Sequence, residues 1–336
     1  MNRRSFGVLG GAALLAGCRS RPSPFGKVRV FVSPRFTVAP IYLADELGLF
    51  RSQGLELDIL EGPESAQSLP LLVSGKLDVS LAPVTPALFN AIAKGARVRV
   101  VACREALVPG CVVGGAVYGR RSVFPQGLED LRKLRGKHVA VTGPASLTAF
   151  WLDTLLESAG MSVNDVRVLY LRLAESAAAL AGGKIDAAVF GPLDKNSDYA
   201  AADIVKSRSA AEMLPGFQYT FVLYGKSLLD EDPSSGTAFL DAFLGGVEAF
   251  LSGRTPQAFD RLAQALRADP AAARGACRDQ FSTSGAVDPS SIQRLLDWAT
   301  RRGFLSVPLK ASEVIEPRFF QEVARRRAAG ASGARK

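Results

Sequence analysis

The sequence predicts an α/β protein of two similar lobes, each a mostly parallel sheet flanked by helices. The first observation is an internal repeat, because residues 72–83 (LVSGKLDVSLAP) recur as residues 180–192 (LAGGKIDAAVFGP), 108 positions further on. The second is that both copies read as a helix closed by glycine, then a short apolar strand, then a proline loop. The third is that strand and helix patterns alternate in both halves, which is typical of a sheet covered on both faces.

The first half contains four predicted strands, at residues 28–32, 56–60, 79–81 and 97–103. Predicted helices separate them, at residues 37–50, 65–73 and 85–94. Pro40 suits the start of the first helix, and Gly75 suits the end of the second. This order predicts the first lobe.

The second half begins with a short helix at residues 128–134 and a strand at 139–142, and the repeat then runs to Pro192. An alternating strand at 219–224 is expected to return the chain to the first lobe. Helices are expected at 237–251, 256–267, 270–281 and 289–302. We expect two crossings, near 112–117 and 219–224, to form a hinge. The predicted limits are therefore 28–111 plus 215–323 for lobe 1, 112–214 for lobe 2, and a disordered basic tail at 324–336.

The N-terminus has the features of an export signal. Arg3 and Arg4 precede an apolar run at residues 7–15, which is too short to span a bilayer. Residues 15–18 (LAGC) resemble the lipobox of bacterial lipoproteins, which implies a signal peptide at 1–17, a lipidated Cys18 and a tether at 18–27. A cleaved soluble secretory signal is the alternative. The general secretory and twin-arginine routes both remain open.

The charge of the chain argues against nucleic-acid binding. The net charge is +9, but residues 1–27 and 324–336 each carry five basic residues and no acid, which leaves the body at about −1. The basic residues therefore gather at the two ends rather than on a binding face.

Catalytic and metal-binding residue types are sparse. His138 is the only histidine, and no C-x-x-C pair occurs. Besides Cys18, the cysteines are Cys103, Cys111 and Cys277, which are either separate buried thiols or include a Cys103–Cys111 disulfide. We expect no metal, no cofactor and no catalytic residues.

Several short motifs resemble those of one known family, in the same order and spacing. They are residues 39–44 (APIYLA), 48–50 (GLF), 54–55 (GL), 75–78 (GKLD), 134–137 (LRGK) and 183–186 (GKID). Together they resemble the type II periplasmic binding proteins of ABC importers, in the branch for nitrate, sulfonates, taurine and thiamine pyrimidines. The resemblance implies a monomer outside the cytoplasm that captures a small solute and delivers it to an ABC permease and its ATPase. With the lipobox, it implies a protein anchored to a bacterial membrane through lipid on Cys18.

The expected ligand contacts lie where strands end, since open α/β sheets bind ligands at the carboxyl ends of their strands. Hydroxyls and free backbone N–H groups at helix starts suit anions, Arg35 could pair with an acidic ligand, and aromatic rings could hold a flat one. The candidates in or beside the first lobe are Ser33, Arg35, Phe36, Thr37, Glu61, Pro83, Thr85 and Tyr219; those in the second are Ser146, Thr148, Phe190 and Pro192.

Each candidate also has a plain structural explanation. The hydroxyls would serve as helix caps, the aromatic rings as core, and Arg35 as a solvated loop charge. We interpret the repeated Asp78 and Asp186 as structural residues at strand entries rather than as catalytic acids.

Three functions are compatible with these observations. The first is solute binding for an ABC importer, with a sulfonate, a nitrate-like anion or a pyrimidine-type compound as ligand. The second is a sensory lipoprotein that binds ligand without transport. The third is an enzyme on the same fold, such as a thiamine-pyrimidine synthase or a relative from menaquinone biosynthesis.

Overall fold

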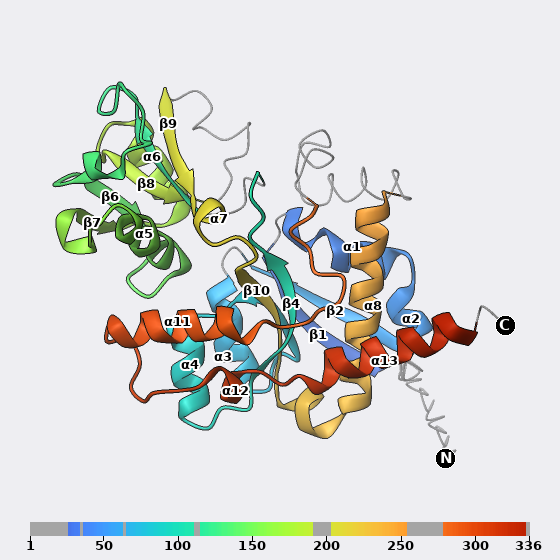
Figure 1. The fold of residues 1–336 in the computed structure, drawn as a ribbon. Helices are drawn as coiled ribbons and strands as arrows, with labels where there is room; N and C mark the ends of the chain where they lie inside the picture. Colours follow the sequence, from blue (N-terminus) through green and yellow to red (C-terminus); the bar gives the residue numbers. More distant parts are fainter. Residues whose placement is uncertain are drawn as a thin grey trace, which may run out of the picture.

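The computed structural model describes residues 26–33, 36–62, 65–110, 115–190, 203–253 and 278–333. They form two lobes, each built on one five-stranded sheet with helices packed against it (Figure 1). The predicted fold class is confirmed. The signal peptide, most of the tether and the predicted helix at 256–267 lie outside the described residues. The predicted helix at 270–281 lies partly outside them, and its last residues, 278–281, form a turn and a bridge instead of a helix.

The sheet of lobe 1 has the order β2-β1-β3-β10-β4. β1 runs parallel to β2 and β3, whereas β10 runs antiparallel to β3 and β4, so one returning strand is reversed and the sheet is mixed. The strands are β1 (Gly26–Val32), β2 (Leu55–Glu61), β3 (Val79–Pro83), β4 (Arg99–Ala106) and β10 (Gln218–Tyr224). The helices are η1 (Phe36–Val38), α1 (Ala39–Glu46), α2 (Leu49–Ser52), η2 (Ser65–Gln67), α3 (Ser68–Val73), α4 (Pro86–Ala93), η5 (Ser227–Glu231), α8 (Pro233–Ser252), α11 (Pro289–Arg301), α12 (Ala311–Val314) and α13 (Arg318–Gly333).

The sheet of lobe 2 repeats this arrangement, with the order β7-β6-β8-β5-β9. β6 runs parallel to β7 and β8, and β5 runs antiparallel to β8 and β9. The strands are β5 (Ala116–Arg120), β6 (His138–Val141), β7 (Arg167–Tyr170), β8 (Ala187–Phe190) and β9 (Ile204–Ser209). The helices are η3 (Leu131–Leu134), α5 (Leu147–Ser158), η4 (Val163–Asp165), α6 (Leu173–Ala181) and α7 (Ala210–Met213).

The repeated aspartates hold equivalent strands in the two lobes. The Asp78 carboxylate accepts a 2.8 Å hydrogen bond from the backbone N–H of Arg29 in β1. The Asp186 carboxylate accepts a 2.9 Å bond from the backbone N–H of His138 in β6. Each aspartate therefore ties the start of its own strand to the backbone of the neighbouring one, and the predicted structural role is confirmed.

Two adjacent segments connect the lobes. The chain leaves lobe 1 after β4 and returns from β9 through α7 to β10. The N–H of Leu107 donates to the Phe217 carbonyl at 2.8 Å, and the N–H of Gly216 donates to the Leu107 carbonyl at 2.7 Å. The predicted position of the second crossing is wrong, because residues 219–224 lie inside β10, between β3 and β4. The crossing precedes β10, and the near-continuous apolar run of 219–224 reflects burial on both faces of a central strand.

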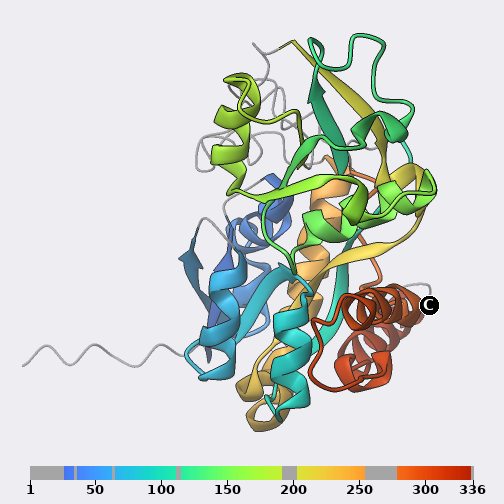
Figure 2. The same ribbon diagram turned by 90° about the vertical axis from the view of Figure 1, so that its left-hand side faces the viewer.

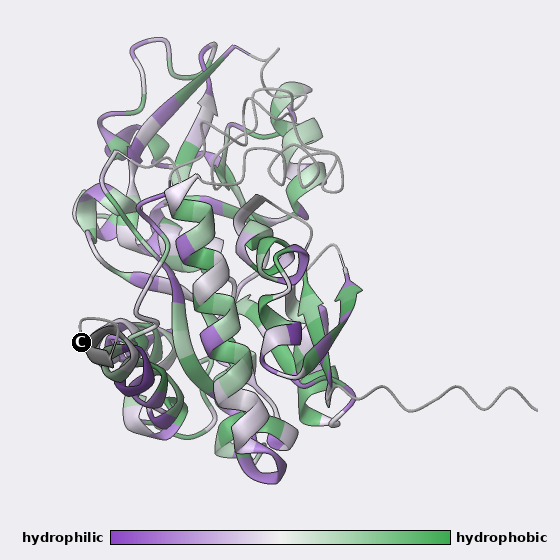
Figure 3. Cartoon of the chain, turned by 90° about the vertical axis from the view of Figure 1, so that its right-hand side faces the viewer, coloured by the Kyte–Doolittle hydropathy of each residue, from purple (hydrophilic) through white to green (hydrophobic). Residues whose placement is uncertain are grey.

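The C-terminal segment is helical where a disordered tail was predicted from Ala324. α13 continues to Gly333, and its Arg327 forms ion pairs with Asp241 and Glu248 of α8. The basic residues of this helix appear as hydrophilic colour near the C-terminus in Figure 3. The prediction of disorder is therefore wrong for residues 324–333. Arg327 pairs with carboxylates of α8, which is far away in the sequence, so the local sequence does not reveal the contact.

A close approach of α1 and α8 depends on one glycine. A Cβ placed on Gly246 would lie 2.3 Å from the Pro40 carbonyl oxygen and 2.6 Å from the Ala44 Cβ. We expect Gly246→Ala to lower the free energy of unfolding by about 1–3 kcal/mol through overpacking, measured by urea denaturation. The control is Gly245→Ala, where the nearest atom is the flexible Leu49 Cδ1 at 3.1 Å. Equal stability of the two variants would contradict this account of the packing.

Candidate functional site

The two crossing segments join the carboxyl edges of the two sheets. β4 shares the direction of β1 and β3, so the chain leaves lobe 1 at the edge where Val32 and Pro83 end their strands. In lobe 2 the chain enters β5 and leaves β9 at the edge where β6 and β8 end. The carboxyl ends of both sheets are therefore brought to the hinge, and the region between them is the candidate ligand site.

Three hydroxyls cluster at the N-terminus of α5 on this edge of lobe 2. Ser146 caps the helix by accepting a 3.2 Å hydrogen bond from the Ala149 N–H. The Thr148 Oγ1 lies 2.9 Å from the Ser146 Oγ and 2.8 Å from the Thr142 Oγ1. The cap confirms the plain structural role of Ser146. It also fixes the hydroxyl cluster of Thr142, Ser146 and Thr148 beside the positive end of a helix dipole, where an anion or polar group is stabilised.

The edge of lobe 1 presents a different set of polar groups. Thr85 caps α4 by accepting a 3.4 Å hydrogen bond from the Leu88 N–H. Glu61, at the end of β2, accepts a hydrogen bond from the Tyr42 hydroxyl. Burial is the largest cause of a raised pKa of Tyr42, and the hydrogen bond to Glu61 is the second. The phenol therefore keeps its proton. This edge therefore carries a cap hydroxyl and an acid–phenol pair.

Ser33, Thr37 and Pro83 also lie at the carboxyl edge of lobe 1. Ser33 directly follows β1 and is buried, and within the described part of the chain its Oγ has no hydrogen-bond partner. Thr37 is half-buried in η1, before α1, and Pro83 is the last residue of β3. Their positions agree with the expected site.

Tyr219 lies where the lobes meet. Its ring is 6.1 Å from that of Trp151 in α5, and its buried hydroxyl has no partner among the described residues. Burial raises the pKa of Tyr219, and the negative charge of Glu105 is the second largest cause of this increase. Glu105 in turn forms a buried 2.8 Å ion pair with Arg104 at the end of β4.

Several of these residues were not predicted from the sequence. Tyr42 lies within a motif noted for the family resemblance, and Thr142 directly precedes the predicted loop, so both could have been found from their positions. Arg104, Glu105 and Trp151 carried no such signal, because strand pairing and packing between the lobes bring them to this edge.

Other candidates lie away from the site or outside the described residues. Phe190 is 1% exposed and packs against Tyr118 at 5.8 Å, so its side chain belongs to the core of lobe 2. Arg35, Pro192 and Cys18 lie outside the described residues, and only the backbone of Phe36 is described. His138 begins β6, at the opposite edge from Ser146.

Cys103 is a buried free thiol, and burial raises its pKa. This finding supports separate thiols over a Cys103–Cys111 disulfide; Cys111 and Cys277 lie outside the described residues. Across the described ranges, no group of three His, Cys, Asp or Glu side chains could hold a metal ion. In the same ranges, no helix has the length and apolarity needed to cross a bilayer.

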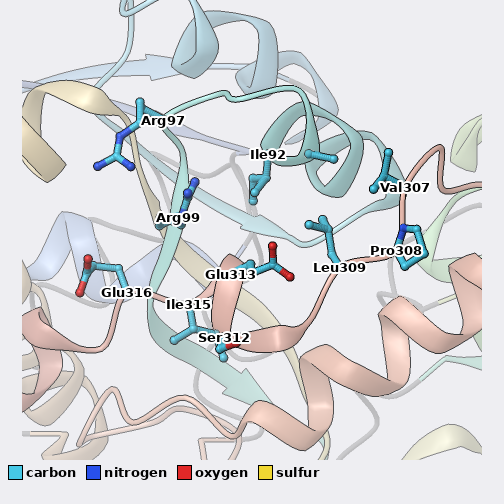
Figure 4. Close-up of a pocket in the computed structure, with 11 residues that line it drawn as sticks. Ile92, Arg97, Arg99, Val307, Pro308, Leu309, Ser312, Glu313, Ile315 and Glu316 are labelled. Atoms are coloured by element: carbon cyan, nitrogen blue, oxygen red, sulfur yellow. The ribbon is translucent and has the colours of Figure 1, made fainter.

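A surface pocket of about 460 Å³ lies elsewhere, at the amino end of β4 (Figure 4). Its wall combines Arg97, Arg99 and Glu313 with apolar residues of α4 and of the segment before α12. Arg97 is already paired with Asp230 at 2.9 Å. Because this pocket is remote from the carboxyl edges, it is not the candidate site.

The two lobes and their paired carboxyl edges have the fold of the two-lobed periplasmic binding proteins. The aliphatic sulphonate binding protein SsuA of Escherichia coli superposes with a TM-score of 0.70, at 17% identity over 87% of this chain and 92% of that one. The nitrate-binding protein NrtA of Synechocystis PCC 6803 superposes with a TM-score of 0.70, at 14% identity over 90% of this chain and 89% of that one.

The chain belongs to the NMT1/THI5-like family, whose model matches residues 35–253. A curated relative is the 4-amino-5-hydroxymethyl-2-methylpyrimidine phosphate synthase THI5 of Saccharomyces cerevisiae, 29% identical over 150 residues. That match covers 45% of this chain and 41% of the yeast protein.

Proposed function

We propose that this protein is the extracytoplasmic solute-binding component of an ABC importer, anchored to a bacterial membrane through lipid on Cys18. It captures a small organic or oxyanionic solute between its lobes and delivers it to a permease and its ATPase. We take the lobes at the predicted limits, 28–111 plus 215–323 and 112–214, with lobe 1 extended by α13 to Gly333. The ligand contacts are the residues predicted at the carboxyl edges, with Phe190 omitted because it is core.

One observation carries this proposal. Two sheets of the same topology are joined at their carboxyl edges by two hydrogen-bonded crossing segments. A solute that contacts both edges gains its full set of contacts only when the lobes are closed, so binding shifts the population toward the closed form. Binding and release require no bond to be made or broken.

A synthase remains the second candidate, because the curated relatives are pyrimidine phosphate synthases. Against it, the only histidine of the chain begins β6 at the edge opposite the hydroxyl cluster, where its backbone N–H is held by Asp186. At the described edge of lobe 2 the hydroxyls lie at a helix N-terminus, which suits binding better than proton transfer, and at the edge of lobe 1 the Glu61 carboxylate is engaged by the Tyr42 hydroxyl.

The ligand can be sought without prior assumption. Native mass spectrometry of freshly purified protein tests for a co-purifying small molecule. A thermal-shift panel of alkanesulfonates, nitrate and aminopyrimidines then ranks candidates, since a ligand that prefers the folded state raises the melting temperature. A panel with no stabilising compound and a protein free of small molecules would count against the proposal.

Anchoring through Cys18 has a separate test. In a bacterial host, we expect the wild-type protein in the membrane fraction and the Cys18→Ala variant outside it. Each methylene group of a lipid chain that is buried in the bilayer contributes about 0.8 kcal/mol to membrane binding, and the variant has no such chain. The control is Cys103→Ala, which changes a buried thiol and should leave the distribution as in the wild type. Membrane association of Cys18→Ala equal to that of the wild type would contradict the anchor.

A further inference from the structure

A second contact joins the lobes beside the crossing segments, where side chains of α5 in lobe 2 meet those of α11 in lobe 1. Figures 1 and 2 show the two lobes and the helices that carry these side chains. The Trp298 indole N–H donates a 2.7 Å hydrogen bond to the Asp153 Oδ2. The Arg302 Nε lies 3.4 Å from the same oxygen. Asp153 and Trp298 are both buried, so a directional polar bond links the two lobes inside the protein.

Aromatic rings from both lobes surround this bond. The Phe150 ring of α5 lies 5.4 Å from that of Phe217 and 5.5 Å from that of Trp298. The Trp151 ring lies 5.7 Å from that of Phe217 and 6.1 Å from that of Tyr219. Phe217 and Tyr219 lie at the end of the second crossing and the start of β10. The aromatic contact therefore packs directly against the hinge.

α5 links this contact to the hydroxyl cluster. Asp153 follows Ser146 by seven residues, about 10 Å along a helix at 1.5 Å per residue. Because a helix of this length moves as one body, whatever holds Asp153 also sets where Ser146 and Thr148 stand relative to lobe 1.

We propose that Asp153 is a positioning residue. Through Trp298 it holds α5 against α11 and so favours the closed arrangement, in which the hydroxyl cluster lies close to lobe 1. This inference rests on the proposed binding function, and it adds a contact that holds the lobes together.

The buried oxygen acceptor at this position supports the inference. Rings alone could slide over one another, since apolar contact is not directional. A buried carboxylate is costly unless it is partnered, but an indole N–H aimed at it selects one register between the helices. Burial raises the pKa of Asp153, while Trp298 and Arg302 act in the opposite sense.

The test uses ligand-free protein and small-angle scattering. Asp153→Ala and Trp298→Phe both remove the bond, and we expect the ratio of open to closed molecules to rise about ten-fold in each, seen as a larger radius of gyration. Asp153→Asn keeps an oxygen for the indole N–H and should stay close to the wild type. Both tryptophans of the chain lie at this contact, so in Asp153→Ala their emission should shift to longer wavelength with stronger acrylamide quenching.

The control is Glu157→Ala, one turn further along α5. It removes an exposed 3.6 Å ion pair with Arg301 at the same helix contact and should leave the radius of gyration unchanged. The inference is overturned if Asp153→Ala lowers the melting temperature while its scattering and quenching match the wild type, because the bond would then serve stability alone. Since no ligand enters this experiment, its failure leaves the proposed binding function untouched, and failure of the ligand panel leaves this result intact.

Discussion

Asp78→Ala is expected to lower the free energy of unfolding by about 3 kcal/mol, because a buried charge partner is lost. The Asp78 side chain is 6% exposed and accepts hydrogen bonds from the backbone and guanidinium of Arg29 and from the Ser227 hydroxyl. Removing it leaves these donors without an acceptor between the middle of β1 and the start of β3. Arg29 is partly exposed and regains some solvation, which keeps the expected loss below that of a fully buried pair. Urea denaturation measures the effect.

The control is Asp58→Ala, which removes an exposed ion pair with Lys27 and should cost well under about 1 kcal/mol. The two losses should therefore differ severalfold. If Asp78→Ala is no more destabilising than Asp58→Ala, the repeated aspartates do not hold the strands as we describe.

The same residue predicts a pH dependence. Burial alone would raise the pKa of Asp78, but the hydrogen bonds from Arg29 and Ser227 outweigh it and lower the pKa below the ordinary value of 3.8. A depressed folded-state pKa stabilises the protein above the unfolded-state pKa, and this contribution is lost as the pH falls through the folded-state value. The stability difference between wild type and Asp78→Ala should therefore be largest near neutral pH and shrink in acid.

The double variant Ser146→Ala/Thr148→Ala is expected to weaken ligand binding by about 1–3 kcal/mol, roughly five- to 150-fold, with the fold retained. The two hydroxyls lie 2.9 Å apart at the N-terminus of α5, so both would face a solute held at that helix end. Calorimetry with the compound selected by the thermal-shift panel measures the change.

Loss of a helix cap is a separate effect that this experiment must exclude. Ser162→Ala is the matched control, because Ser162 caps η4, the short helix that follows α5, well away from the carboxyl edge. It should alter stability slightly and leave affinity unchanged. Unchanged affinity in the double variant would place the ligand contacts elsewhere.

The sequence was sufficient to predict the two lobes and most of their strands, although not β5 (Ala116–Arg120). The repeat around Asp78 and Asp186, with glycine and proline at fixed positions, marks equivalent points in two copies of one topology. β9 was not predicted, because KSRS within Ile204–Ser209 alternates charge and small polar residues without the apolar run of a buried strand. It is an edge strand, paired only with β5.

The site was harder to predict than the fold. Ser146 was recognisable because caps and anion contacts favour the same residue types at helix starts. Phe190 was chosen for its position after a strand, but whether a ring faces the core or the edge depends on neighbours such as Tyr118, which lie far away in sequence. The Asp153–Trp298 bond joins residues 145 positions apart in different lobes, so no local sequence pattern could predict it.

The most direct test of the central claim is equilibrium binding of the selected compound to purified protein, followed by mass-spectrometric analysis of the recovered ligand. A solute-binding protein should take up one molecule per chain, reversibly, and release it chemically unchanged. Recovery of a converted product, or saturable binding that survives removal of lobe 2, would contradict the proposal that the two lobes close on a solute for transport.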